Sequence, residues 1–448
     1  MRRFLIPVLL ACLGLALAAR LMPIEHAKVV EQLADFPDAD IASERMRPLV
    51  VGGLCMMPAL GALLYAFGGT IARYVTRQFL ALFAITFCGL AVIWLLMDFE
   101  DNLEELKLSG DIIGTALQLY VARLPQLTVT LLPYALMLSL LFCLGRLSGS
   151  REIVAMLQTG RGIGRVTLPF VLAGLIAATI SAGLNFHWAP QSNVREDRIL
   201  AAARGLDEKA AEFVQFRNPR APRLWMVGTF PRDYQKGAPL ERVRIIGETE
   251  EGKLNSVLVA RTAAWSPSDG SWSFADATLR HIKAGEPPIY EPDLPNPYVV
   301  HSWRETPAEI IRPGLPANQL GIPELIGWLR SKRSQDARGE AVHLTQWHHR
   351  IAEPFNCVIV ILLAIPLGIF FSRRGTSGGL ALAVFLCAGL LFFTNICLSL
   401  GDSGHLPPVL AAWLPNLIFG ALALYLFRRR ITGRPIYQVI RSMIPNEA

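Results

Sequence analysis

Cysteine is absent from the largest polar stretch of this chain, and charge is absent from the interior of its long apolar runs. All seven cysteines lie within apolar segments, and none lies in the polar block from about Pro190 to Gln346. A disulfide framework in that block is therefore excluded, and we interpret the thiols as small buried hydrophobes. Only 18% of the residues are charged while 52% are hydrophobic, which favours a membrane protein over a soluble one.

The motifs of common catalytic sites are also missing. The chain has no G-x-x-x-x-G-K-[ST] loop, and Gly160–Gly164 offers neither the lysine nor a preceding strand, so any nucleotide hydrolysis is expected from another chain. Ser139 lacks a G-x-S-x-G setting. The spacing of His343, His348 and His349 does not put three ligands on one helical face. We therefore predict no catalytic residue, no metal site and no cofactor bound by this chain.

Apolar runs long enough to cross a bilayer recur along the sequence. A crossing takes about 20 apolar residues. The six runs that form a core are Phe79–Met97, Leu127–Gly145, Thr167–Leu184, Pro354–Phe371, Gly378–Leu400 and Leu406–Phe427. Two more, Phe4–Ala19 and Leu49–Gly69, precede them. The predicted fold is a membrane α-helical bundle with a six-span core and two extra N-terminal spans.

Arginines gather at alternate ends of these runs. They are Arg2, Arg3, Arg73, Arg77, the group from Arg146 to Arg165, Arg373, Arg374 and the group from Arg428 to Arg430. Because basic residues near helix ends stay cytoplasmic, both termini are predicted to be cytoplasmic and the polar block external. The first run also resembles a secretory signal ending in Ala16–Ala18, and its cleavage would leave the same topology. This cytoplasmic collar explains the net charge of +7, so no nucleic-acid partner is predicted.

The external block changes to an alternating pattern typical of strands. The predicted strands are Glu212–Arg217, Arg223–Phe230, Arg242–Glu248, Val257–Trp265 and Ser271–His281. Several short strands at this spacing indicate an all-β antiparallel sandwich or jelly roll. Its large aromatic residues are expected in the core or along an apolar groove for acyl chains, and they are Trp225, Trp265, Trp272 and Phe274.

A short amphipathic helix is predicted between the second and third core spans, over residues 150–160. Ser150 is expected to cap its first amides, and Gly160 suits the left-handed residue that ends a helix. Ile153, Met156 and Leu157 fall on one face. With arginines on both sides, the helix either lies on the lipid surface or docks in a groove of a soluble partner.

Polar residues at the span ends are the other candidate site. Asn356 and Asn416 are interpreted as helix-packing residues. Arg123, at the outer end of the second core span, either grips a lipid phosphate or extends to the headgroup layer. Prolines in several spans introduce kinks, which favours a wide cavity over a narrow pore.

A series of short motifs runs in a fixed order through the core. They are Tyr74-x-x-Arg77-x-Phe79, Leu124-Pro125 with Leu132-Pro133, Gly145-Arg146-Leu147 before Arg151-Glu152-Ile153-Val154-Ala155-Met156 and Gly160, Asn185 with Pro190, Arg350-Ile351-x-x-Pro354, and Ala412-Trp413-Leu414-Pro415-Asn416. With three spans on either side of an external domain, the chain resembles the LptF/LptG permease family of lipopolysaccharide export over about residues 71–430.

The resemblance implies a specific role. Members of this family pair with an identical or paralogous permease, bind a cytoplasmic ABC ATPase (LptB-like), and pass lipopolysaccharide to a periplasmic bridge (LptC/LptA-like). They lie in the inner membrane of Gram-negative-type bacteria, and ATP is used by the partner ATPase. The family's ATPase-coupling helix corresponds here to Arg151, Glu152, Ile153, Met156, Leu157 and Gly160.

The implied domain boundaries leave part of the chain without a role. They are an extension at 1–70, core spans at 71–189 with the coupling helix at 150–160, a periplasmic β-jelly-roll domain at 190–320, a connecting helix and core spans at 321–430, and a cytoplasmic tail at 431–448. The function predicted from this arrangement is lipopolysaccharide export, and the alternative is a membrane-anchored scaffold or sensor. A secondary transporter is a weaker option, because it would carry ionisable residues near mid-membrane.

Overall fold

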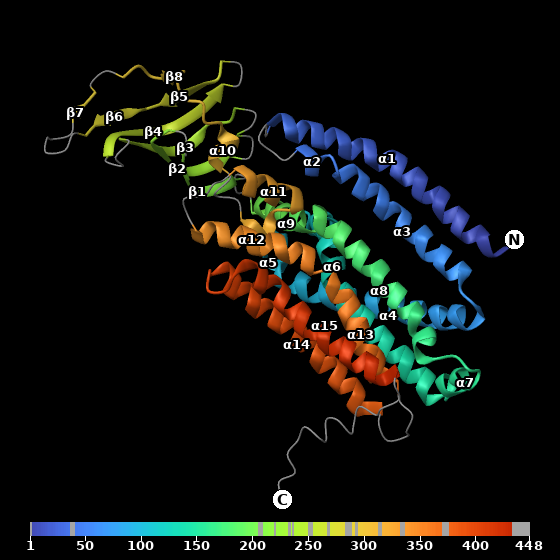
Figure 1. The fold of residues 1–448 in the computed structure, drawn as a ribbon. Coiled ribbons are helices and arrows are strands. Elements are labelled where there is room, and N and C mark those ends of the chain that lie inside the picture. The colour runs from blue at the N-terminus through green and yellow to red at the C-terminus, as the bar shows by residue number, and fades with distance from the viewer. Residues whose placement is uncertain are drawn as a thin grey trace, which may run out of the picture.

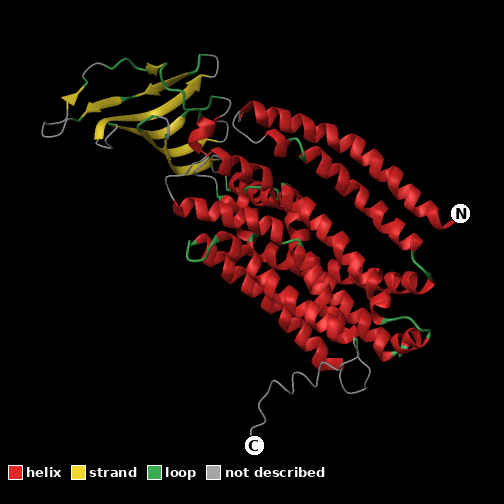
Figure 2. Cartoon of the chain, in the orientation of Figure 1, coloured by secondary structure: helices red, strands yellow, loops and turns green. Residues whose placement is uncertain are grey.

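The protein is a long helical bundle with a β domain at one end, as Figures 1 and 2 show. This is a computed structural model, and it describes residues 2–35, 41–204, 209–218, 221–231, 234, 237–249, 254–266, 269–282, 289–291, 294–311, 316–331, 337–369 and 376–431. The predicted tail at 431–448 lies outside these ranges beyond its first residue.

The extra N-terminal segments form an antiparallel helical hairpin. It consists of α1 (Leu5–Asp35), the short α2 (Ile41–Glu44) and α3 (Arg47–Phe67). Close packing of α1 on α3 depends on glycine, because a Cβ at Gly14 would come within 2.6 Å of the Cys55 carbonyl oxygen. In Figure 1 the hairpin, drawn in blue, lies along one side of the bundle.

Seven helices are long and apolar enough to cross a membrane, or eight if one bent pair counts as a span, within the ranges described. The core helices and their connections are α4 (Thr70–Asp101), α5 (Leu103–Leu108), α6 (Ile112–Gly149), α7 (Glu152–Gln158), α8 (Ile163–Phe186), α9 (Trp188–Ala203), α11 (Ile322–Ser331), α12 (Ala337–Ala352), α13 (Phe355–Gly368), α14 (Thr376–Asp402) and α15 (Pro408–Ile431). The predicted helical fold class is confirmed.

The bent pair is α12 and α13, which meet at an angle of 49°. Pro354 begins the second of them, and a proline cannot donate the hydrogen bond that would continue the first helix. Asn416 of α15 instead donates to the carbonyl of Ala352, at 2.7 Å. One predicted packing asparagine therefore satisfies a backbone group freed at the bend, and Asn356 lies buried on α13.

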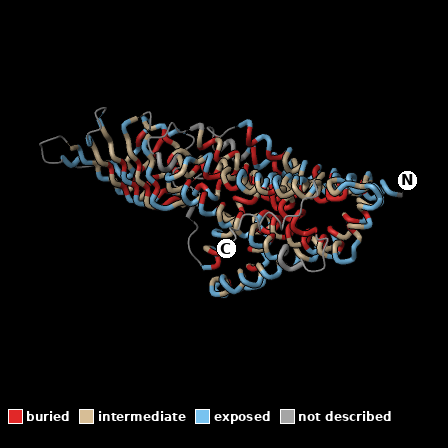
Figure 3. The backbone as a smooth tube through the Cα atoms, turned by 60° about the horizontal axis from the view of Figure 1, so that its bottom comes forward, coloured by how far each residue is buried: buried red, intermediate tan, exposed pale blue. Residues whose placement is uncertain are grey.

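The core of the bundle surrounds α6. Side chains of α6 and α13 contribute most to one buried apolar cluster, which includes Leu140, Leu144 and Ile361, and α8 adds Phe170 to it. Figure 3 shows this buried material running along the inside of the bundle, with exposed residues on the outer helices. The exposed apolar side chains of α4 and α14, such as Phe385 and Phe392, match a lipid or protein environment rather than water.

All eight described strands pair in one antiparallel sheet. They are β1 (Lys209–Arg217), β2 (Arg223–Pro231), β3 (Leu240–Glu248), β4 (Leu254–Ser266), β5 (Ser271–Ala275), β6 (Thr278–His281), β7 (Ile289–Tyr290) and β8 (Tyr298–Val300). The order along the sheet is β1-β2-β3-β4-β5-β8, with β6 between β4 and β7. The predicted all-β insertion is therefore confirmed, and its strands follow one another as a meander.

The last of the predicted strands is interrupted but keeps its register. Thr262 pairs with Ala275 and Val259 with Thr278, so β5 and β6 lie opposite one continuous strand, β4. Asp276 separates them with a φ of 51°, a left-handed conformation that aspartate tolerates. The interruption lets β5 pair onward with β8 while β6 pairs with β7.

The β domain buries its aromatic residues on one face of the sheet. Trp225, Trp272 and Phe274 are each fully buried, and Trp265 is partly buried against the same cluster. The short helix α10 (Pro307–Ile311) adds two buried isoleucines to this core. These four aromatic residues therefore pack the domain and do not form an open groove for acyl chains.

Candidate functional site

The predicted amphipathic helix is present as α7, between α6 and α8. It is preceded by Arg151 in the left-handed conformation, with a φ of 61°, and followed by Gly160 with a φ of 79°. The glycine prediction is thus confirmed, but the expected cap is wrong. Ser150 belongs to the end of α6, because its amide bonds to the Arg146 carbonyl at 3.0 Å, and no side chain caps α7.

Glu152 fixes the first turn of α7 to its neighbours. The Tyr74 hydroxyl on α4 donates to Oε2 of this carboxylate at 2.8 Å, and the Ser150 hydroxyl donates to Oε1 at 2.8 Å. A carboxylate in the first turn also complements the positive end of the helix. Glu152 therefore positions α7 relative to α4 and α6.

The apolar face of α7 packs on the bundle itself. Ile153 and Met156 are only 2% and 8% exposed and belong to the transmembrane core, and Leu157 packs against it. This corrects the prediction that these three side chains form a docking face or lie on lipid. The opposite face is exposed, and it consists of Arg151, Ala155, Gln158 and Thr159. A partner that docks on α7 would meet this face.

Arg123, the candidate lipid contact, is already engaged by two carboxylates. Its Nε donates to Glu196 of α9 at 2.6 Å, a second bond reaches the other oxygen of Glu196, and a third reaches Asp98 of α4. Its guanidinium also lies over the Trp94 ring. A phosphate would have to displace both acids to reach this guanidinium, and the lipid contact stays a prediction. Arg123 clamps α4, α6 and α9 together.

Glu196, one of the two acids paired with Arg123, is partly buried. Burial raises the pKa of Glu196 above its ordinary value, although the bonds from Arg123 act in the opposite direction.

A buried polar cluster joins the N-terminal hairpin to the core, and sequence reasoning missed it. Arg47 donates to Glu44 at 2.9 Å and to Nε2 of His187 at 2.8 Å. Trp188 donates to Glu25 of α1 at 3.0 Å. All of these groups except Trp188 are nearly or fully inaccessible. The only signal in the sequence was a set of acids and two arginines, Arg45 and Arg47, near the hairpin turn.

A second polar group links α8 to the bent helix pair. Asn185 donates to Glu353 at 2.7 Å, and Arg350 donates to the backbone carbonyl of Asn318 at 2.5 Å. Asn185, Arg350 and Pro354 belong to the motif series, and the structure brings them together at the bend. Their role is to hold this part of the bundle, since both charged side chains are partly or fully buried.

The histidines of α12 contact different partners and do not form one site. His343 stacks on Trp328 with ring centroids 3.5 Å apart, and His349 lies 3.8 Å from Glu353. Among the residues that the structure describes, no group of three His, Cys, Asp or Glu side chains could hold a metal ion.

These features define a class: a polytopic membrane protein with a β domain inserted between two sets of spans and a short helix held between two spans. The chain belongs to the family described as lipopolysaccharide export system permease LptF/LptG, whose model matches residues 73–429. The predicted resemblance is therefore confirmed. The extra hairpin, α1 to α3, lies outside the matched range.

Two relatives from Escherichia coli strain K12 agree with this assignment. The chain is 22% identical over 390 residues to the lipopolysaccharide export system permease protein LptG, and the alignment covers 81% of this chain and 99% of the relative. It is 26% identical over 376 residues to the permease protein LptF, covering 80% of this chain and 94% of the relative.

Proposed function

We propose that this chain is a transmembrane permease subunit of an ABC transporter that takes lipopolysaccharide from the inner membrane and passes it to a periplasmic bridge. The observation that carries the proposal is the placement of α7 and the β domain at opposite ends of the bundle (Figure 1). The end with α7 can receive mechanical work in the cytoplasm, while the end with the β domain can contact the lipid on the external side. Both termini are then cytoplasmic, unless the first segment is cleaved.

The energy comes from a separate cytoplasmic ABC ATPase of the LptB type, which binds and hydrolyses ATP. This chain binds no cofactor in the proposal. The ATPase docks on the exposed face of α7, where Arg151, Ala155, Gln158 and Thr159 are accessible. Movement at that face reaches the bundle directly, because Ile153 and Met156 on the other face are part of its core.

The remaining partners follow the family. A second permease, identical or paralogous, faces this one across apolar helix surfaces, and α14 offers a suitable surface because Phe385 and Phe392 are 73% and 70% exposed. The β domain contacts a bridge protein of the LptC/LptA type. Its open sheet edge is a place where a strand of another β protein can add.

The test is co-purification of the transporter with its ATPase and lipid. Changing Ala155 to Arg places a long charged side chain on the exposed face of α7 and should abolish recovery of the ATPase while the chain still inserts. Thr70, which is also exposed at the start of α4, provides the matched control as Thr70→Arg. Absence of both ATPase and lipopolysaccharide from the wild-type preparation would favour the anchored scaffold.

A further inference from the structure

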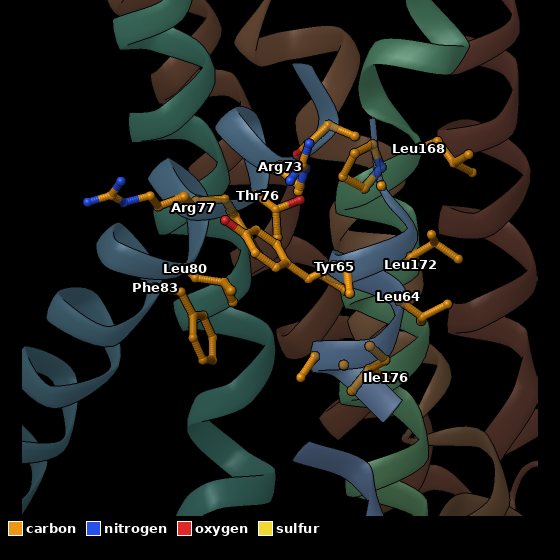
Figure 4. Close-up of a pocket in the computed structure, with 18 of the residues that line it drawn as sticks. Leu64, Tyr65, Arg73, Thr76, Arg77, Leu80, Phe83, Leu168, Leu172 and Ile176 are labelled. Atoms are coloured by element: carbon orange, nitrogen blue, oxygen red, sulfur yellow. The ribbon is translucent and has the colours of Figure 1, made fainter. Parts of the chain in front are cut away.

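An apolar cavity of about 910 Å³ lies between the N-terminal hairpin and the core, at the upper end of the size range of ligand pockets. Its walls come from the start of α1, the end of α3, the first turns of α4 and most of α8. Figure 4 shows Arg73, Thr76 and Arg77 on α4 together with Tyr65 of α3 at this cavity. The hairpin, which lies outside the family match, supplies one whole wall.

The polar part of the lining is strongly basic. Five arginines line the cavity and no Asp or Glu does; they are Arg3, Arg73, Arg77, Arg161 and Arg165. They lie at the end of the bundle where arginines collect, which the charge asymmetry makes cytoplasmic. Nε of Arg73 is buried and has no hydrogen-bond partner within the described chain. An anion bound among these arginines would satisfy the buried Nε of Arg73 and balance the local positive charge.

The rest of the lining is apolar and long. Lining residues on α8 run from Arg165 to Ile180, which corresponds to roughly 22 Å along a helix axis. Leu80 and Phe83 of α4 and Leu136 of α6 continue the apolar surface. A ligand that fits has an anionic head at the cytoplasmic surface and hydrocarbon that extends toward the bilayer centre.

We propose that this cavity binds one anionic glycerophospholipid of the cytoplasmic leaflet. Its phosphate lies among the arginines, because guanidinium groups bind phosphate through paired hydrogen bonds, and basic pockets between membrane helices on the cytoplasmic side hold anionic headgroups. Its acyl chains lie between α3, α4 and α8. The extension at residues 1–70 thus completes a lipid site, and the bound lipid links the hairpin to the core. The proposal depends on the predicted orientation of the chain in the membrane, and it does not depend on lipid export.

The experiment uses the purified, delipidated full chain and native mass spectrometry. Dioleoylphosphatidylglycerol and dioleoylphosphatidylcholine share acyl chains, so preferential retention of the first reports the arginines. Arg73→Gln with Arg77→Gln should lower that retention about tenfold or more. The control is Arg428→Gln with Arg429→Gln, which removes two arginines at the end of α15 that do not line the cavity and should retain the lipid.

A second variant keeps the test decisive if the arginine variant folds poorly. Ala173 lines the apolar part of the cavity, and Ala173→Phe should block the acyl chains without altering charge. Phosphatidylglycerol with a photoactivatable acyl chain should then lose its crosslinks to peptides containing Leu80 and Ile176. Retention equal for both lipids, retention unchanged by either variant, or crosslinks to a second permease in this position would overturn the proposal.

Discussion

The guanidinium of Arg47 donates to Nε2 of His187 at 2.8 Å, across 140 residues of sequence. On the other side of the ring, Nδ1 of His187 lies 2.6 Å from Glu324 of α11. Burial alone would raise the pKa of Glu324, but contact with His187 holds that pKa below its usual value. A chain of contacts therefore connects the N-terminal hairpin, α8 and α11.

Loss of Arg47 should detach the hairpin from the core. Arg47→Leu leaves the buried acids Glu25 and Glu44 without their shared cation, at a cost of about 3 to 5 kcal/mol. Hydrogen exchange should rise in α1 and α3 and stay low in α13. Arg45 is exposed, so Arg45→Leu serves as the control and should leave exchange unchanged. Unaltered protection of the hairpin in Arg47→Leu would mean that apolar packing alone holds it.

The spans, the strands and the family were predictable from the sequence because their signals are local. Hydropathy over about 20 residues identifies a span, and alternation identifies a strand. Pairings between distant residues left no such signal: Arg123 and Glu196 are 73 positions apart. The face of α7 was assigned wrongly for a related reason. Periodicity shows that Ile153 and Met156 share a face, but it does not say what covers that face.

Removal of Arg123 should lower the stability of the helix bundle and have a smaller effect on lipopolysaccharide binding. Arg123→Leu leaves Asp98 and Glu196 unpaired in a partly buried site, which should cost about 2 to 3 kcal/mol. Apparent melting temperature in detergent measures the loss. Adding Glu196→Leu should restore part of the stability. A loss of bound lipopolysaccharide that persists in the restored double variant would instead make Arg123 a lipid contact.

Truncation of the inner face of α7 should lower stability. Met156 is 8% exposed in the bundle core, and Met156→Ala should cost about 2 kcal/mol or more through the cavity it leaves. The comparison variant is Gln158→Ala on the exposed face, which should leave the melting temperature unchanged. Equal melting temperatures for both variants would show that α7 does not rest on the core as the structure has it.

The β domain should lose stability in acid through Glu305. Burial would raise the pKa of this carboxyl, but donors from Asn218 at 2.7 Å and Arg223 at 2.8 Å outweigh it and hold the pKa below the usual 4.5. The folded domain then binds fewer protons than the unfolded one, so this contribution is full above about 4.5 and is lost as the pH falls through the lower folded pKa.

Fluorescence of Trp225 and Trp272, both buried in the same domain, reports its unfolding by denaturant at each pH. Glu305→Gln should lower stability at neutral pH and flatten the dependence below about pH 4.5. Glu291 is half exposed, so Glu291→Gln is the control and should keep the wild-type profile. An acid profile identical in Glu305→Gln and wild type would assign the transition to other groups.

The orientation of the chain should place both ends of the six-span core on the cytoplasmic side. Four exposed positions report it when each is changed to cysteine in a background without the seven native cysteines: Lys107, His405, Thr70 and Thr159. A membrane-impermeant thiol reagent added to intact cells should label positions 107 and 405, and should label 70 and 159 only after the inner membrane is opened. Because basic residues near helix ends remain in the cytoplasm, the arginines around α7 require this result. Labelling of position 159 from outside would reverse the orientation and remove α7 from the reach of any cytoplasmic ATPase.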